Sequence, residues 1–173
     1  MFLMKKIFFL LVILSSALLV HAQTETPIEK TYPYQKDSTL PEFKMLETDS
    51  ATWFNSDQLP KDRPVVIVYF NPECGHCQLT AHEFLEKKDM FKDAFFVWIT
   101  YRATMDEIKK FAEDAKMTDD KNIVFGKEMK YTIVPFYNVQ YTPYVAVYND
   151  KGKLLQTYDG GTTPETIAHL LHP

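Results

Sequence analysis

Cysteine is scarce in this sequence, because its 173 residues contain only Cys74 and Cys77. Two thiols cannot build a disulfide-dense scaffold, and they exclude a four-cysteine zinc site. An excess of positive charge is also missing: the formal net charge is -4, which argues against a basic nucleic-acid-binding domain. The apolar run at residues 7–20 has 14 residues, fewer than the ~20 that usually span a bilayer.

Apolar side chains, by contrast, are plentiful. Hydrophobic residues make up 46% of the chain and aromatic residues 14%, whereas 24% of the residues are charged. This composition supports a real hydrophobic core and argues against a largely disordered chain. For a chain of this length we expect one domain, or one domain and a tail.

The N-terminus has the pattern of a secretory signal peptide. Lys5 and Lys6 precede the apolar run, which ends in a Val-His-Ala triplet with a cleavage site after Ala22. We therefore predict that residues 1–22 are a signal peptide and that the rest is exported to the periplasm, where a disulfide can persist. The alternative is an uncleaved membrane anchor.

The segment after the signal peptide is polar. Residues 23–40 lack hydrophobic periodicity and contain Pro27 and Pro33, so we predict a flexible N-terminal segment, although Tyr32 and Tyr34 could still pack on the domain. The folded domain is expected at residues 41–173.

Predicted strands and helices alternate along this domain. Two runs of β-branched and aromatic residues have no polar alternation and read as strands buried on both faces. Thr104 and Glu107 form a capping box, and Thr163 followed by a proline caps a last helix. Together these signals predict an α/β layer with a hairpin at one edge. Strands are expected at residues 43–46 (a possible edge strand), 65–70, 95–100, 122–125, 144–148 and 153–158, and helices at residues 74–88, from 104 and from 163.

The two cysteines stand directly after a predicted buried strand, where Cys74, Gly75, His76 and Cys77 open a predicted helix. A cysteine at a helix N-terminus faces unpaired backbone N–H groups and the positive end of the helix dipole, which favour its thiolate. Cys77 follows one turn later and can close a disulfide with Cys74. Gly75 leaves room for a partner's backbone, and a protonated His76 would favour the thiolate further. A stabilised thiolate makes the disulfide more oxidising.

Residues 65–77 resemble the active-site strand and turn of the thioredoxin superfamily, and the Cys-Gly-His-Cys tetrad is typical of protein disulfide isomerases. The signal peptide and the start at residues 41–43 resemble the exported bacterial TlpA/ResA-like thiol–disulfide oxidoreductases. The resemblance covers residues 41–171. It implies a thioredoxin-like fold, a central mixed β-sheet flanked by helices, and thiol–disulfide exchange that needs no cofactor besides the cysteine pair.

The resemblance also assigns substrate-binding positions. Thr142 and Pro143 stand just before a predicted strand, at the family's X–cis-Pro position. There Pro143 would be cis, and the backbone of Thr142 would pair with an extended substrate segment. Phe70 and Glu73 occupy the family's tryptophan positions before the first cysteine, and they complete the candidate substrate-binding set.

This sequence departs from the family at the second cysteine's proton acceptor. The family's buried acidic residue, six positions before the first cysteine, is Val68 here, so no proton acceptor for Cys77 can be named. Glu73 brings a negative charge that opposes the effect of His76, which leaves the net shift of the Cys74 pKa undecided.

The leading hypothesis is an exported enzyme that exchanges disulfides with protein substrates. Its expected partners are cysteine-containing exported proteins and a membrane thiol–disulfide electron donor or acceptor, with no nucleic acid. The alternative is a module that binds a soft metal such as Cu(I) through the same two thiolates. His82 could assist such a site, although a solvated or packed helix histidine is the simpler interpretation.

The remaining aromatic residues are interpreted as packing groups. Trp53 and Trp98 are expected in the core. A further aromatic cluster surrounds the proline loop, and part of it could offer an apolar surface to unfolded substrate. This cluster comprises Tyr131, Phe136, Tyr137, Tyr141 and Tyr144.

Overall fold

The computed structural model describes residues 31–173, which form a seven-stranded mixed sheet flanked by helices. The predicted signal peptide and residues 23–30 lie outside the described residues. The order of the strands in the sheet is β2-β1-β5-β4-β3-β6-β7. This is the α/β class expected from the sequence. The strands are β1 (Lys44–Glu47), β2 (Trp53–Asn55), β3 (Val65–Tyr69), β4 (Phe95–Thr100), β5 (Ile123–Glu128), β6 (Tyr144–Tyr148) and β7 (Leu154–Asp159).

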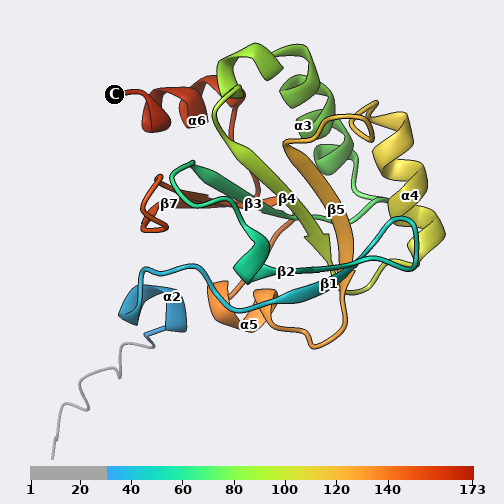
Figure 1. Ribbon diagram of the computed structural model, residues 1–173, viewed down its shortest axis with the longest axis horizontal. Helices are drawn as coiled ribbons and strands as arrows, with labels where there is room; N and C mark the ends of the chain where they lie inside the picture. Colours follow the sequence, from blue (N-terminus) through green and yellow to red (C-terminus); the bar gives the residue numbers. More distant parts are fainter. Residues whose placement is uncertain (1–30) are drawn as a thin grey trace, which may run out of the picture. The chain divides into compact units, whose positions relative to one another are not determined.

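The helices lie on both faces of this sheet (Figure 1). One core cluster joins buried residues of α3, α4 and α6 to Val66 and Val68. The other cluster joins Ile133 and Tyr137 of α5 to Val65 and Ile67, which alternate with the first pair along β3. The helical segments are α2 (Pro33–Lys36), η1 (Ser56–Gln58), α3 (Gly75–Glu86), η2 (Lys88–Phe91), α4 (Met105–Asp114), α5 (Ile133–Tyr137) and α6 (Pro164–Leu171).

The central strands β3, β4 and β5 are parallel, and β6 runs antiparallel to β3. All five residues of β3 are buried, as its uninterrupted apolar sequence predicts. Because these three strands are parallel, their carboxyl ends lie at the same end of the sheet, and so do the loops that follow them. The cysteine pair comes directly after β3 and therefore lies at this end of the sheet.

Two predictions for the first strands were wrong. Residues 43–46 were expected at an edge, but β1 lies between β2 and β5 and is antiparallel to both. β2 was not predicted, and it forms the edge instead. Trp53 is not in the core either: it stands on this edge strand with 41% of its surface exposed, and the Lys44 ammonium lies 4.5 Å from the ring centroid. Phe54, the next residue, takes the buried position because successive side chains of a strand point to opposite faces.

Residues 31–40 contact the rest of the domain, including the packing that the sequence analysis allowed for Tyr34. Tyr34 of α2 packs on Tyr137, with ring centroids 5.9 Å apart. Thr39 forms an isolated antiparallel bridge with Lys153, and Leu154 donates its N–H to the carbonyl of Ser38 at 2.7 Å. An apolar contact at Tyr137 and hydrogen bonds beside β7 thus attach this polar segment to the domain.

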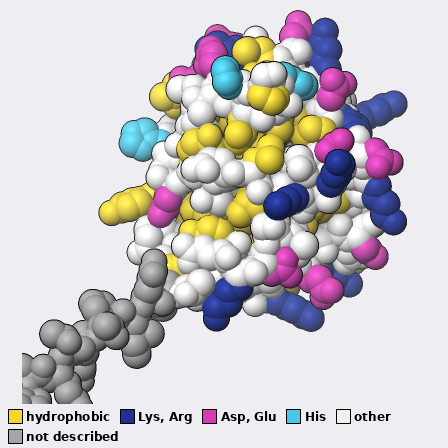
Figure 2. Space-filling view, turned by 90° about the vertical axis from the view of Figure 1, so that its left-hand side faces the viewer, with side chains coloured by type: hydrophobic (Ala, Val, Ile, Leu, Met, Phe, Trp, Pro, Cys, Tyr) yellow, Lys and Arg dark blue, Asp and Glu magenta, His cyan; other side chains and the backbone are white. Residues whose placement is uncertain are grey.

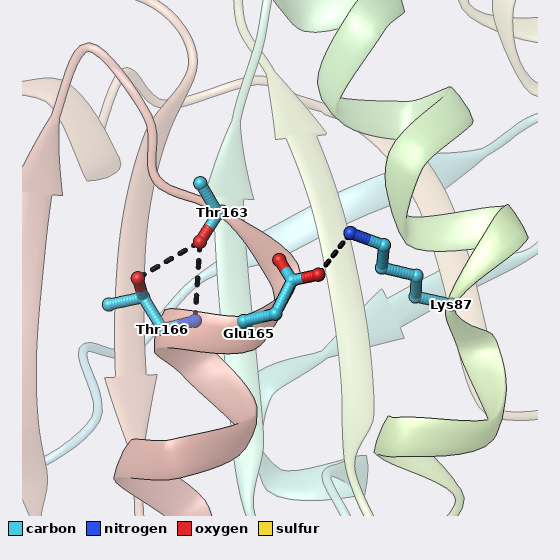
Figure 3. A network of polar contacts seen from close by, with 4 residues as sticks. All are labelled: Lys87, Thr163, Glu165 and Thr166. Atoms are coloured by element: carbon cyan, nitrogen blue, oxygen red, sulfur yellow. Dashed lines mark hydrogen bonds and ion pairs between the residues drawn. The ribbon is translucent and has the colours of Figure 1, made fainter.

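Surface contacts tie the last helix to the rest of the domain. Lys87, at the end of α3, pairs with Glu165 in the first turn of α6, and Thr163 caps the same helix by accepting from Thr166 (Figure 3). Seen from the side of β7 and α6, charged side chains of both signs are interspersed and hydrophobic side chains gather between them (Figure 2). Within residues 31–173, no helix is long and apolar enough to cross a membrane.

Candidate active site

A tightly bonded loop carries Cys74 from β3 to the start of α3. The Cys74 N–H donates to the carbonyl of Asn71 at 3.0 Å, and the Asn71 side chain accepts from the N–H of Glu73 at 3.2 Å. Gln78 of α3 reaches back and donates to the carbonyl of Pro72 at 2.9 Å. These bonds hold Cys74 at the N-cap of α3, where the sequence places it.

The two cysteines have different surroundings. Both are free thiols, but Cys74 is half-buried whereas Cys77 has 0% of its surface exposed and belongs to the core. The Cys74 sulfur donates to the backbone carbonyl of Thr142 at 3.4 Å. An incoming group can therefore reach Cys74, whereas Cys77 is shielded from solvent.

The surroundings also separate the acidities of the two thiols. Burial acts to raise the pKa of Cys74, but hydrogen bonds from the Thr142 side chain, from Cys77 and from the backbone of His76 outweigh it, so the pKa is lowered. Burial, with a smaller contribution from the neighbouring Cys74, raises the pKa of Cys77 to about 12. The pair thus divides into an accessible, more acidic thiol and a buried thiol that holds its proton.

The proline loop lies directly opposite Cys74. The Thr142–Pro143 peptide bond is cis, which is the isomer expected from the sequence, and Pro143 is buried at the start of β6. Asp159, at the end of β7, accepts from the N–H of Tyr141 at 2.8 Å and from that of Gln140 at 3.3 Å. These bonds fix the two residues that lead into Thr142.

Gly161 packs against the proline loop. Its φ is +97°, and a Cβ at this position would lie 3.1 Å from Cγ of Pro143 and 3.8 Å from the hydroxyl of Thr80. Sequence analysis missed the roles of Asp159 and Gly161. The Gly160-Gly161 pair was a usable signal for an unusual backbone, but nothing in the sequence pointed from Asp159 to a loop 18 residues away.

The other predicted site residues fall into two groups. Gly75, His76 and Glu73 are exposed beside Cys74, and a Cβ on Gly75 would meet no atom within 4 Å. Phe70 is different, and its assignment to the substrate-binding set is corrected. It has 0% exposure, and its ring centroid lies 5.6 Å from that of Trp98, which it meets edge-on, and 4.7 Å from that of Phe111, which is tilted against it. The side chain points into the core because Phe70 continues the alternation of Val66 and Val68.

No carboxylate stands next to Cys77 in the described part of the chain. Val68 is fully buried in the same cluster as Cys77. Glu128 is the buried acidic residue of residues 31–173, and it packs at the opposite face of the sheet, where it accepts from the N–H groups of Thr132 and Ile133. The proton of Cys77 must therefore leave to a group that is not a buried acid.

His82 does not join the cysteine pair. Its Nε2 lies 3.4 Å from the Glu86 carboxylate, and the two side chains are 65% and 60% exposed. Within residues 31–173, no three His, Cys, Asp or Glu side chains gather closely enough to hold a metal ion. A soft-metal site would have to rely on the two thiols of Cys74 and Cys77.

Comparison with known proteins assigns the chain to a protein family. Residues 56–172 match the family model of the thioredoxin-like domain, so the chain belongs to this family. No curated protein sequence matches the chain.

Solved structures share the fold at low sequence identity. A secreted disulfide oxidoreductase of Mycobacterium tuberculosis is 20% identical, with a TM-score of 0.61 over 74% of this chain and 93% of its own. The thioredoxin domain of a Bacteroides vulgatus thiol-disulfide oxidoreductase is 12% identical, with a TM-score of 0.63 over 81% of this chain and 94% of its own. StoA from Bacillus subtilis is 14% identical, with a TM-score of 0.58 over 77% of this chain and 98% of its own.

Proposed function

We propose that this protein is an exported thiol–disulfide oxidoreductase that exchanges disulfides with protein substrates through Cys74 and Cys77. The observation that carries the proposal is the division of the pair: Cys74 is accessible with a lowered pKa, and Cys77 is buried one helical turn away with a raised pKa. Two solved structures with this fold are named as disulfide oxidoreductases, which supports the same chemistry. Export is supported by the signal-peptide pattern of residues 1–22.

The proposed reaction begins at the Cys74 thiolate. It attacks one sulfur of a substrate disulfide, a Cys74–substrate disulfide forms, and the other substrate sulfur leaves with the electron pair and takes a proton. Thr142 lies beside the attacking sulfur, so an extended substrate segment can pair with its backbone. The exposed Tyr141 side chain, with 70% of its surface accessible, offers an apolar contact next to this position.

The second step uses Cys77. Its sulfur loses a proton and attacks the Cys74 sulfur, which releases the second substrate thiolate and leaves the Cys74–Cys77 pair oxidised by two electrons. The charge and hydrogen bond of Cys74 help to raise the pKa of Cys77, and both disappear once Cys74 is bound to the substrate. As Cys77 attacks, its proton passes to the substrate sulfur that is being displaced, so the absence of a buried acid near Val68 does not block the step.

The direction of net transfer depends on the reduction potential. A lowered Cys74 pKa stabilises the reduced pair, which makes the disulfide more oxidising. We therefore propose a potential above the ~−270 mV of thioredoxin and toward the ~−180 mV of protein disulfide isomerase. Such a protein donates or reshuffles disulfides in exported proteins, with a membrane thiol–disulfide protein as its redox partner and no bound cofactor.

Insulin-disulfide reduction with dithiothreitol tests the proposal. The wild-type protein and a His82→Ala control are expected to accelerate it equally, and Cys74→Ser is expected to abolish the acceleration. Full activity of Cys74→Ser would contradict the proposal. Stoichiometric Cu(I) binding that requires both cysteines, together with no measurable exchange rate, would favour the metal-binding alternative instead.

A further inference from the structure

A groove of about 500 Å³ lies between α3 and α4, which stand side by side (Figure 1). We refer to it as the α3–α4 groove. Its lining includes Pro72 and Glu73, the two residues that precede Cys74. The groove therefore begins next to the thiol that is proposed to attack the substrate.

The α3–α4 groove and Thr142 lie on opposite sides of Cys74. Strand β3, which leads to Cys74, stands between β4 and β6 in the sheet. Thr142 precedes β6, whereas α4 connects β4 to β5 on the other side. A substrate segment that pairs with the backbone of Thr142 and passes over Cys74 therefore continues toward the groove. Because an extended residue spans about 3.3–3.6 Å, a side chain next to the substrate cysteine can reach it.

The floor of the groove is apolar. Ala81 of α3 and Phe111 of α4 line it with only 1% and 5% of their surfaces exposed, and Ala115 is partly buried beside them. The aliphatic stem of a long side chain can pack on such a floor while its charged end stays hydrated at the rim. The shape of the groove thus suits a long side chain with a polar end.

The basic side chains at the rim of the groove already have acidic partners. The Lys110 ammonium is paired with the Asp114 carboxylate at 2.8 Å. Nε2 of His82 lies 3.4 Å from the carboxylate of Glu86. Neither basic group therefore offsets a further carboxylate.

Two other carboxylates at the rim lack a cationic partner. Among residues 31–173, Glu73 forms no ion pair, and it is exposed. Glu107 accepts from the N–H and the hydroxyl of Thr104, and these bonds hold its pKa below the ordinary value, so the carboxyl stays ionised. Lys127 adds a smaller attraction from outside the groove. The groove thus has an excess of negative charge beside Cys74, which favours a cationic occupant.

We propose that the α3–α4 groove binds a lysine or arginine side chain next to the reacting cysteine of the substrate, and that Glu73 is the residue that selects for it. The aliphatic stem packs on Ala81 and Phe111, and the cationic end faces the carboxylates of Glu73 and Glu107. An exposed ion pair contributes modestly, so we expect a preference of about fivefold and not an absolute requirement. The inference rests on the proposed function, since it concerns which disulfides Cys74 attacks.

Two matched peptide disulfides test the proposal on the reduced protein. In the first, a short acetylated peptide carries lysine on both sides of a cysteine that is disulfide-bonded to thionitrobenzoate. In the second, both lysines are replaced by norleucine, which keeps an aliphatic stem without the charge. Attack of the Cys74 thiolate on the peptide sulfur breaks this disulfide, and thionitrobenzoate leaves with the electron pair and is followed by its absorbance. We expect a second-order rate constant about fivefold higher for the lysine peptide at low salt, and a smaller preference at high salt.

Three variants locate the preference in the groove. Glu73→Gln should lower the lysine-to-norleucine ratio of rate constants to about twofold or less, and any change in the reactivity of Cys74 itself cancels in this ratio. Lys110→Met leaves the Asp114 carboxylate without its partner, so the ratio should rise to about twice the wild-type value. Glu113→Gln is the matched control: it removes the same charge from an exposed position of α4 outside the groove, and the ratio should not change.

Equal rate constants for the two peptides with the wild-type protein would overturn the proposal. It would also be overturned if Glu73→Gln kept the wild-type ratio, or if Glu113→Gln lowered the ratio as much as Glu73→Gln. Rapid release from both peptides in these cases leaves the proposed function intact. Release from both peptides that is no faster than with Cys74→Ser would overturn the proposed function together with the inference.

Discussion

The sulfur of Cys74 lies 3.4 Å from the backbone carbonyl oxygen of Thr142, a residue 68 positions further along the chain. This contact joins the N-cap of α3 to the cis peptide bond that begins β6, and it places the accessible thiol against a backbone that can pair with a substrate. Because Asp159 holds the preceding residues, three separate segments define the surroundings of one sulfur atom.

The pH dependence of alkylation should separate the two thiols. The pKa of Cys74 is lowered from its ordinary value near 9 and that of Cys77 is raised to about 12. Iodoacetamide should therefore modify Cys74 with a half-maximal rate below pH 9, whereas Cys77 stays unmodified in the folded protein. Mass spectrometry of tryptic peptides measures both rates. Equal rates for the two cysteines at pH 8 would contradict the assignment.

Thr142→Ala removes the side-chain hydrogen bond that favours the Cys74 thiolate and leaves the backbone carbonyl in place. The pKa of Cys74 should rise, and the alkylation rate at pH 7 should fall about fivefold, the equivalent of one modest hydrogen bond. Thr118→Ala, at an exposed position away from the site, is the matched control and should react as the wild type does. An unchanged rate in Thr142→Ala would mean that the hydroxyl does not act on the sulfur.

Asp159→Ala should loosen the proline loop without touching either cysteine. The variant loses the acceptor for the N–H groups of Gln140 and Tyr141, so Thr142 is no longer held opposite Cys74. We expect kcat/KM for insulin reduction to fall about threefold to tenfold, with a larger effect on KM than on kcat. Asp150→Ala, at the exposed β6–β7 turn, is the control for loss of an acidic side chain.

Local sequence signals predicted the parts of the fold that depend on neighbouring residues. The capping box of Thr104 and Glu107 and the cap of Thr163 are confirmed, because each is closed within one helical turn. The buried strands β3 and β4 are confirmed as well, since their side chains are apolar on both faces. The placement of the cysteine motif is local in the same sense, because a strand, a short turn and a helix suffice to put Cys74 at an N-cap.

Long-range relationships were the part that the sequence could not supply. The position of β1 between two strands depends on its register with β5, and Phe70 turned out to be a core residue because strand alternation continues past the end of β3. Asp159 has no local partner, so its bonds to the proline loop only emerge once β7 is placed.

Glu128 should make stability depend on pH. Burial raises the pKa of this carboxyl above its ordinary value, although the N–H groups of Thr132 and Ile133 partly oppose the shift. The folded state therefore binds the proton more tightly than the unfolded state does. Its contribution to the free energy of unfolding is largest below the unfolded pKa, and it declines as pH rises through the raised folded pKa.

Glu128→Gln removes this titration and keeps an oxygen that can accept from the same N–H groups. Urea unfolding of both proteins at pH 5, 6 and 7 measures the effect. Relative to the variant, the wild type should lose stability as the pH rises, and other titrating groups cancel in the difference. A wild-type advantage that grows with pH would show that the carboxylate is stabilised by its site.

Gly126→Ala should destabilise the sheet where β1 meets β5. A Cβ on Gly126 would lie 2.7 Å from the backbone oxygen of Leu46 and 3.0 Å from the Met45 side chain, so one strand must shift. We expect a loss of about 2 kcal/mol or more in the free energy of unfolding. Gly75→Ala is the control, because a Cβ there meets open space, and its stability should change by less than about 0.5 kcal/mol.

The most direct test of the proposed chemistry is to trap the mixed disulfide. Cys77→Ser and Cys74→Ser are incubated separately with a disulfide-containing protein substrate, quenched with acid and analysed by non-reducing mass spectrometry. We predict that Cys77→Ser accumulates a covalent adduct through Cys74, which a thiol reductant releases, and that Cys74→Ser accumulates none because Cys77 is buried and holds its proton. Adducts of equal yield in both variants, or an adduct only in Cys74→Ser, would contradict the assignment of Cys74 as the attacking thiol.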